Sequence, residues 1–293
     1  MDLGKRMNHE IKNILSFDIE GLVESSHDSM TIPDKYIDSK KENHQIEQNT
    51  QEILKILDKF NTKGTFFILG RIAKDIPQLI REISDEGHEI ACHSLDHRRL
   101  YDFKKEEIIH KITEGKKLLE DACGKKVIGF RAPDFSIIKK NIYVFDELLE
   151  AGYEYDSSVY PIGMHDVYGI SDFKKEPFIM DNGLVELPMS TVSLFNKSIP
   201  FGGGGYFRIF PFFVTKFLYD NLQKTGRPLN FYLHPYEIGK DVTYMKEISL
   251  LRKIRTYVGV KKTEKKIEKL IKLGGFGRAD HYVKNIKSRM GYV

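Results

Sequence analysis

The sequence predicts an α/β protein whose core is a sheet of parallel strands. Short apolar runs typical of buried strands alternate with longer amphipathic segments typical of helices, and this alternation indicates repeated β/α units. The chain has 293 residues, and α/β barrels of roughly 250 residues commonly form one domain. The polar residues best suited to chemistry follow the predicted strands directly, where the carboxyl ends of parallel strands gather functional groups.

Seven apolar runs are expected to form the strands, at residues 13–17, 64–69, 88–92, 127–130, 153–155, 184–187 and 229–233. The segments between them with helical periodicity include 46–60, 72–86 and 104–122. We expect one domain over the whole chain, with a barrel at about residues 11–240 and a C-terminal helical extension at 241–293.

Two regions outside this alternation also have an expected structure. The stretch 22–45 is polar and has no clear periodicity, so it is expected to be a long loop that shapes a cleft over the strand ends. Beyond residue 237 the helical patterns at 245–257 and 263–273 are too short for a separate domain. They are expected to pack against the barrel.

Composition excludes several classes of protein. Apolar residues make up 41% of the chain and charged residues 30%, and no apolar run approaches the roughly 20 residues of a membrane-spanning helix. A net charge of +4 is too small to indicate a nucleic-acid partner without a recognised binding motif. Polar residues follow the first methionine in place of an apolar region, so no signal peptide is expected. Met7 is a second candidate start. Cys92 and Cys123 fit a reducing compartment, and the expected location is cytoplasmic.

The strongest chemical pattern is the segment His93-Ser94-Leu95-Asp96-His97, taken together with Asp18 and Glu20. Histidines four residues apart fall on one face of a helical turn, where both can bind one divalent ion. Asp18 and Glu20 are two residues apart, so they face the same side of an extended strand. Two histidines, one carboxylate and an open position for water form a catalytic zinc site. The alternatives are solvated carboxylates and histidines without a ligand role.

Two further residues follow predicted strands. Arg131 comes after the fourth strand, and its permanent charge suits it to hold a catalytic carboxylate ionised. Pro133 stiffens the turn that follows. His234 comes after the seventh strand, where it is suited to act as a general acid. The alternatives are a surface salt bridge for Arg131 and a neutral core histidine for His234.

Two surface patterns have competing interpretations. The glycine run 202–205, followed by Tyr206 and Arg208, can bring backbone amides close to a sugar or phosphate, or can be a flexible loop. It lacks the spacing of dinucleotide-binding and P-loop motifs. The cluster of lysines at 261, 262, 265, 266 and 269 favours a solvated helix face over a membrane-binding patch.

At these residues the chain resembles the NodB-type polysaccharide deacetylases, which are metal-dependent enzymes on a distorted (β/α)7 barrel. The resemblance spans nearly the whole chain. The motifs that carry it are Asp18-x-Glu20, His93-Ser-x-x-His97, Arg131-x-Pro133 and Leu233-His234. Further stretches resemble the branch found in bacterial exopolysaccharide loci, which includes exosortase-associated members; they lie at 155–161, 165–169, 203–208 and 232–237.

The resemblance implies a role for each motif residue. Asp18, Arg131 and His234 would be catalytic, with Asp18 as general base and His234 as general acid. Glu20, His93 and His97 would bind the metal, and the substrate would contact Pro133, Asp156, Gly204, Tyr206 and Arg208.

The first motif departs from the family pattern. Most members have two adjacent aspartates there, whereas this chain places Ile19 between its carboxylates and has Glu second, so Asp18 and Glu20 could exchange roles. Asp134 stands where many members have an aromatic residue, so an oxyanion contact at that point would come from a backbone N–H. Either Asp156 or Asp166 could orient His234 or Arg131.

The expected function is hydrolytic removal of N-acetyl groups from an amino sugar, in a polysaccharide or in its nucleotide- or lipid-linked precursor. The expected cofactor is one divalent ion, Zn or else Co or Ni. A lipid-linked substrate would bring peripheral membrane contact, while the oligomeric state stays open. The alternatives are a hydrolase of cyclic amides or imides on the same barrel and a glycan-binding module without catalysis.

Overall fold

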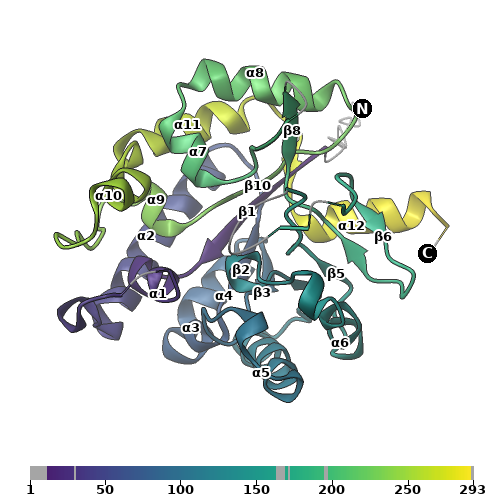
Figure 1. Ribbon diagram of the computed structural model, residues 1–293, viewed down its shortest axis with the longest axis horizontal. Helices are drawn as coiled ribbons and strands as arrows, with labels where there is room; N and C mark the ends of the chain where they lie inside the picture. Colours follow the sequence, from purple (N-terminus) through teal and green to yellow (C-terminus); the bar gives the residue numbers. More distant parts are fainter. Residues whose placement is uncertain (1–11, 30, 163–168, 171, 195–196, 292–293) are drawn as a thin grey trace, which may run out of the picture.

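A computed structural model describes residues 12–29, 31–162, 169–170, 172–194 and 197–291 (Figure 1). Its centre is a sheet of seven parallel strands in the order β10, β1, β2, β3, β4, β5, β7. Short strands extend this sheet: β6 (Phe178–Ile179) pairs antiparallel with β7, and β11 (Phe276–Gly277) pairs with β1. A separate hairpin is formed by β8 (Thr191–Leu194) and β9 (Lys197–Pro200).

The seven parallel strands are the seven that the sequence predicts, with slightly different ends. Their bounds are β1 Asn13–Ile19, β2 Thr65–Ile68, β3 Glu89–Cys92, β4 Gly129–Phe130, β5 Tyr155–Asp156, β7 Val185–Glu186 and β10 Asn230–Leu233. The predicted α/β fold, a distorted (β/α)7 barrel, is confirmed. Within the described residues no backbone ladder joins β7 to β10. The Asn230 side chain spans that gap by donating to the carbonyl of Leu187 at 2.9 Å.

Strand β1 shows how the barrel separates packing from chemistry. All seven of its residues are buried, and its side chains alternate between two environments. Leu15, Phe17 and Ile19 belong to the large core under the helices. Ser16 and Asp18 point to the other side, where both contact the Arg131 guanidinium. The inner face of the sheet therefore carries the polar groups.

Twelve α-helices occur in the described residues. Their bounds are α1 Leu22–Ser26, α2 Ser39–Lys59, α3 Gly70–Asp75, α4 Pro77–Asp85, α5 Lys105–Cys123, α6 Val144–Glu150, α7 Gly204–Ile209, α8 Phe212–Gln223, α9 Pro235–Ile238, α10 Leu250–Tyr257, α11 Val260–Ile271 and α12 Ala279–Arg289. The prediction of one helix at 72–86 is wrong, because the segment breaks into α3 and α4 at Ile76. Pro77 lacks an N–H and disfavours helical geometry at the residue before it.

The prediction of a long loop at 22–45 is also wrong. The segment contains α1, a 3-10 turn at Asp34–Tyr36 and the first turns of α2. Helix α2 begins where the Asp38 side chain accepts a hydrogen bond from the backbone N–H of Lys41, which is N-capping. Most of the first turn of α2 lies at the surface, so its residues are polar and show no apolar helical periodicity in the sequence.

The C-terminal region packs on the barrel as expected through α11 and α12, whereas no residue of α10 is buried. Helices α10 and α11 replace the predicted 245–257 and 263–273, while β11 and α12 were not predicted. Ala279 and Val283 of α12 join inward-facing side chains such as Phe67 and Tyr155 in a second apolar cluster. Helix α12 therefore covers the inner face of the sheet away from the strand ends that carry the polar motifs.

A buried carboxyl group in this region gives a testable pH dependence. Glu89 accepts hydrogen bonds from the hydroxyls of Thr65 and Tyr155 and from the backbone N–H of Asp280. Burial and the charge of Asp280, which itself pairs with Arg278, raise the pKa of Glu89 from 4.5 to about 8. The folded protein therefore keeps a proton that the unfolded chain releases.

This contribution to stability is complete below pH 4.5 and is lost as the pH rises through about 8. We expect the free energy of unfolding to fall by up to about 1.4 kcal/mol per pH unit over that range. Denaturant titrations at several pH values would measure the slope. Glu89→Gln should flatten it, whereas Glu86→Gln, at a more exposed neighbour, should not. An equal slope in Glu89→Gln would contradict the assignment.

Candidate metal centre and active site

Three predicted metal ligands meet at one end of the barrel. Glu20 follows β1, and His93 and His97 lie in the loop after β3. The Glu20 Oε2 atom is 3.2 Å from His93 Nε2 and 2.8 Å from His97 Nε2. All three side chains are buried, and their ligand atoms lie within 4.8 Å of one another. The carboxylate and the two imidazoles thus converge on a single point.

The donor set of this cluster fits a divalent ion. His93 Nδ1 is 2.8 Å from the carbonyl oxygen of Arg131, so a neutral His93 donates from Nδ1 and presents the lone pair of Nε2. Glu20 Oε2 is buried and faces the Nε2 atoms of both imidazoles. Two imidazole nitrogens and one carboxylate oxygen suit Zn, Co or Ni. The residues therefore fit the expected metal.

The electrostatic surroundings of the cluster favour a positive charge beside the Glu20 carboxylate. Burial opposes ionisation of Glu20, yet the neighbouring His97 and His234 hold the pKa of Glu20 well below its usual range. Burial likewise disfavours a charged His97, but the Glu20 carboxylate raises the pKa of His97 to about 10. A cation next to Glu20 is thus strongly favoured, and a divalent ion satisfies the same demand.

The two histidines do not lie on a helical turn as predicted. Residues 93–97 form an irregular loop in which Ser94 has a positive φ of 70°. Helix α3 anchors this loop, because the backbone N–H of Gly70 donates to the Ser94 carbonyl at 2.9 Å. A Cβ atom on Gly115 of α5 would lie 2.8 Å from the same carbonyl oxygen. Close packing of two helices, rather than helical spacing, brings the imidazoles together.

Asp18 forms a buried ion pair with Arg131. The distance from Asp18 Oδ1 to Arg131 Nη1 is 2.6 Å, and Arg131 also donates to the hydroxyls of Ser16 and Ser157. The guanidinium is fully buried, with its carbon 4.0 Å from the centre of the Phe67 ring. The alternative of a surface salt bridge for Arg131 is therefore wrong.

His234 directly follows β10 and faces the cluster of Glu20, His93 and His97. Its Nε2 atom is 3.3 Å from Glu20 Oε1, and its Nδ1 atom is 2.8 Å from Glu237 Oε2. The ring stacks on Tyr236 with centroids 4.8 Å apart. Burial disfavours a charged His234, but Glu237 and Glu20 raise its pKa to about 9. Glu237 therefore orients the His234 ring. This role of Glu237 was not predicted from the sequence.

The spacing of Glu237 is a signal that sequence reasoning missed. Glu237 is the third residue after His234, and its Oε2 atom also accepts the backbone N–H of His234 at 3.0 Å. This arrangement is a capping box at the start of α9. Of the two candidates that the sequence offers for orienting His234, Asp166 lies outside the described residues, and Asp156 lies elsewhere in the barrel.

Asp156 supports the backbone near Arg131. It is fully buried, and its oxygens accept from the backbone N–H of Ser158 at 2.8 Å and from the Ser158 hydroxyl at 2.6 Å. The same hydroxyl accepts the N–H of Ala132 at 2.8 Å. Burial and the charge of Asp156 raise the pKa of the adjacent Glu186. Asp156 is not among the residues that line the cavity described below, and its substrate contact stays a prediction.

Of three other predicted substrate contacts, Arg208 and Gly204 lie beside Glu237, whereas Tyr206 lies at the surface. Arg208 is buried and donates from Nε to Glu237 Oε1 at 2.7 Å, while its other nitrogens donate to carbonyls of residues 255, 256 and 258. A Cβ atom on Gly204 would lie 2.1 Å from Glu237 Oε2. Tyr206 is exposed, with its ring near Phe210. The glycine run thus makes room for a carboxylate of the protein itself.

Replacing Arg208 tests this arrangement. Arg208→Met leaves the buried Glu237 carboxylate without its cation, and breaking a buried ion pair costs about 3–5 kcal/mol. We expect the free energy of unfolding to fall by that amount in denaturant titrations. Arg255→Met is the matched control, because only the backbone of this exposed arginine takes part in the network. Equal stability of both variants would contradict the assigned role.

The site residues line a cavity of about 130 Å³. Pro133 is buried and starts the 3-10 turn Pro133–Phe135, and Asp134 in that turn reaches the cavity wall. Arg99 holds the Asp134 carboxylate at 2.8 Å. The cavity is lined by Asp18, Glu20, Ser25, His93, His97, Ala132, Asp134, Phe135, Tyr232, His234 and Tyr236.

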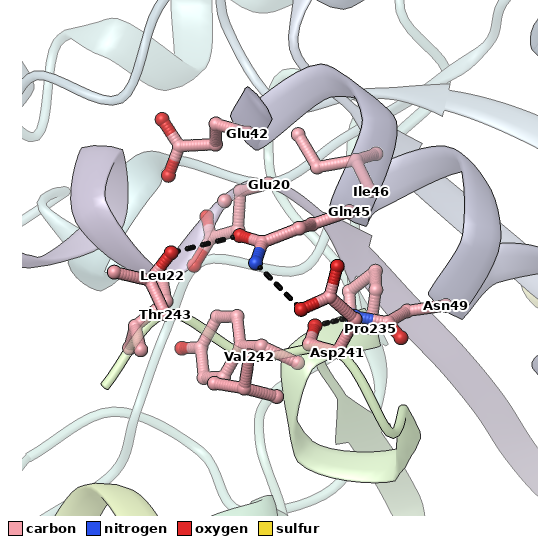
Figure 2. Close-up of a pocket in the computed structure, with 12 residues that line it drawn as sticks. Glu20, Leu22, Glu42, Gln45, Ile46, Asn49, Pro235, Asp241, Val242 and Thr243 are labelled. Atoms are coloured by element: carbon pink, nitrogen blue, oxygen red, sulfur yellow. Dashed lines mark hydrogen bonds between the residues drawn. The ribbon is translucent and has the colours of Figure 1, made fainter. Parts of the chain in front are cut away.

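Helix α2 forms the wall behind Glu20, which sequence reasoning also missed (Figure 2). Gln45 accepts from the Thr243 hydroxyl and donates to Asp241, and Asn49 donates to the Asp241 carbonyl. These bonds tie the chain beyond α9 to α2. They border a small pocket of about 10 Å³, which is about the room that one water molecule needs.

Glu42 of α2 fixes the turn that follows Glu20. Its Oε1 atom accepts the backbone N–H groups of Val23 and Glu24 at the start of α1. A Cβ atom on Gly21 would lie 2.0 Å from the same oxygen. The Glu20 carboxylate is therefore positioned by a contact that requires glycine at the next residue.

Comparison with family models divides the chain into two parts. Residues 29–155 match the polysaccharide deacetylase family, and residues 157–284 match a domain of unknown function, DUF3473. The two matched parts share one sheet, because β5 of the first part pairs with β7 of the second. The second part supplies His234, Glu237 and Arg208. The domain of unknown function thus completes the cavity.

Curated relatives match a limited part of the chain. A chitooligosaccharide deacetylase of Azorhizobium caulinodans is 38% identical over 85 residues, which are 29% of this chain and 40% of the relative. A peptidoglycan-N-acetylmuramic acid deacetylase of Bacillus subtilis is 32% identical over 105 residues, which are 36% of this chain and 39% of the relative. The matches thus span less than half the length of these relatives.

Solved structures share the fold over nearly the whole chain. A Mycobacterium smegmatis protein described as a polysaccharide deacetylase has a TM-score of 0.65 at 18% identity, with 95% of this chain and 92% of that chain covered. Puue allantoinase has a TM-score of 0.64 at 16% identity, with 94% and 89% covered. At such identities the likeness concerns the fold alone. The family match at residues 29–155 and the likeness to named deacetylases show that this part of the chain is similar to polysaccharide deacetylases.

Proposed function

We propose that this protein is a metal-dependent hydrolase that removes N-acetyl groups from an amino sugar, in a polysaccharide or in a nucleotide- or lipid-linked precursor of one. The observation that carries the proposal is the meeting of Glu20, His93 and His97 in one cavity with Asp18, which pairs with Arg131. The names of the relatives, which act on chitooligosaccharide or peptidoglycan, support this substrate class.

Glu20, His93 and His97 would hold one divalent ion, which we propose to be Zn, with Co or Ni as alternatives. When bound, such an ion acts as a Lewis acid that polarises an acyl carbonyl and acidifies water. The buried surroundings of the three side chains strengthen this effect, because the low local dielectric screens charge weakly.

Asp18 is the proposed general base. Its carboxylate lines the cavity, and the hydrogen bond from Arg131 at 2.6 Å holds it in place to accept a proton from water. Glu20, by contrast, lies against both histidines. This difference in surroundings favours Asp18 as base and Glu20 as ligand over the exchanged assignment.

His234 is the proposed general acid. Glu237 holds its Nδ1 atom, which leaves Nε2 on the side of Glu20. The negative charges of Glu237 and Glu20 favour the protonated imidazole. His234 can therefore donate a proton to the amine nitrogen that departs when the amide C–N bond breaks. Acetate and a free amino sugar are the products.

Two finer proposals concern the branch of the family and the location of the protein. The branch found in exopolysaccharide loci is supported by sequence motifs of which residues 163–168 lie outside the described chain. The expected cytoplasmic location stays a prediction. Among the described helices, none is both long and apolar enough to cross a membrane.

Release of acetate tests the proposed function. Purified protein would be incubated with N-acetylglucosamine oligomers and with peptidoglycan fragments, after chelation and after addition of Zn. We expect acetate to be released only when metal is present. Ring opening of small cyclic amides without acetate release would instead support the alternative hydrolase. Binding of the glycans without turnover, with metal bound, would support the glycan-binding alternative.

A further inference from the structure

Helix α10 presents its apolar side chains to solvent. Leu250, Leu251, Ile254 and Val258 are all exposed, and the first two have exposed fractions of 74% and 59%. Their spacing places them along one side of the helix and its C-cap. A surface helix normally turns such a side to the core. Here no residue of α10 is buried, so the apolar side is available to a partner.

Helix α7, which lies beside α10, also has exposed apolar side chains. Arg208 of α7 donates to backbone carbonyls at the end of α10, which fixes the two helices side by side. Figure 1 shows α10 next to α7 and α9. Tyr206 and Ile209 of α7 are both 44% exposed. We call the exposed side chains of Leu250, Leu251, Ile254, Val258, Tyr206 and Ile209 the outer face.

The chain segment that forms α10 carries charges of one sign only. The segment from Ser249 to Lys262 contains no carboxylate and five cations, which are Arg252, Lys253, Arg255, Lys261 and Lys262. In the described residues no ion pair joins any of these five to an acidic side chain. The segment therefore combines exposed leucines with uncompensated positive charge.

We propose that the outer face docks on an anionic lipid bilayer. An amphipathic helix with large apolar residues on one side and Lys or Arg beside them lies in the interface of a membrane, where apolar burial and attraction to anionic headgroups act together. A second copy of the chain fits less well, because two such segments would bring five cations against five. The charge of the segment thus selects the lipid surface.

The lysines of the cluster at 261–269 differ in their contacts. Lys266 donates from Nζ to three backbone carbonyls at the end of α7, at residues 207, 208 and 210, so it is a structural cap. Lys261, Lys262 and Lys265 are exposed. The interpretation of the whole cluster as one solvated face is therefore incomplete.

Docking at the outer face would place the cavity near the membrane. Tyr257 of α10 donates to the carbonyl of Thr243 and accepts the N–H of Met245. Tyr257 also packs in a cluster with Leu22 of α1 and with Tyr236, which lines the cavity. The inference rests on α10 and α7 and not on the proposed reaction. If both hold, a lipid-linked amino sugar is the favoured substrate.

Sedimentation with vesicles tests the proposal. The full chain would be mixed with vesicles of phosphatidylcholine alone and of phosphatidylcholine with phosphatidylglycerol. We expect binding to the anionic vesicles, weakened by salt. Leu250→Ser with Leu251→Ser, and separately Lys253→Glu with Arg255→Glu, should each weaken it by about tenfold or more. Ile142→Ser is the control, because Ile142 is an exposed apolar residue outside the outer face.

The outcomes separate docking from catalysis. The leucine variant should release acetate from soluble oligomers at the wild-type rate, and Asp18→Asn should bind vesicles like the wild type. No binding to either vesicle, or equal binding by the leucine variant and the wild type, would overturn the proposal. A dimer in analytical ultracentrifugation that the leucine variant loses would also overturn it, in favour of a second copy at this face.

Discussion

Replacing His93 and His97 together with alanine is expected to remove the bound metal and the proposed deacetylase activity. The two Nε2 atoms supply two of the three converging ligand atoms at Glu20, and a single carboxylate binds divalent transition metals weakly. We expect about one Zn, Co or Ni ion per wild-type chain and almost none in the variant. Acetate release should fall by about 10³-fold or more, since metal assistance is worth several kcal/mol.

The measurement is elemental analysis of protein purified without a histidine tag, together with the acetate assay. His27→Ala with His110→Ala is the matched control, because both of these histidines lie outside the cavity. It should keep its metal and its activity. Retention of metal by the His93 and His97 variant would place the ion elsewhere, and an intact activity would exclude the proposed centre.

Asp18→Asn is expected to leave metal binding intact while lowering turnover by about 10²–10⁴-fold, the usual contribution of a general base. The amide oxygen can still accept the hydrogen bond from Arg131, so the change removes basicity more than shape. The variant should therefore fold and bind metal like the wild type. Steady-state kinetics with the Zn-loaded protein should show the loss in kcat with little change in KM.

Glu20→Gln gives the opposite pattern and separates the roles of the two carboxylates. Glu20 contacts both imidazoles, so its loss should lower the metal content first and the activity as a consequence. If Asp18→Asn lost the metal and Glu20→Gln kept it, the two residues would have exchanged roles. Near-normal turnover of metal-loaded Asp18→Asn would remove Asp18 from the reaction.

The meeting of Glu20, His93 and His97 could be predicted from the sequence, but the contacts that hold His234 could not. Glu20, His93 and His97 carry strong local signals, because they directly follow buried strands whose carboxyl ends share one edge of a parallel sheet. Arg208 lies 29 residues from its partner Glu237, and no periodicity links the two. The glycine run therefore resembled a substrate loop, whereas the structure shows that Gly204 accommodates the Glu237 carboxylate.

The seven parallel strands, their order along the chain and the strand ends with polar residues are all encoded locally, by apolar runs and helical spacing. Three other features become visible only in the folded chain. Residues 93–97 form a loop, Asp156 supports Ala132 through Ser158, and α10 turns its leucines outward. Such features depend on which surfaces meet when distant segments pack, and that choice is made by burial and charge pairing across the whole fold.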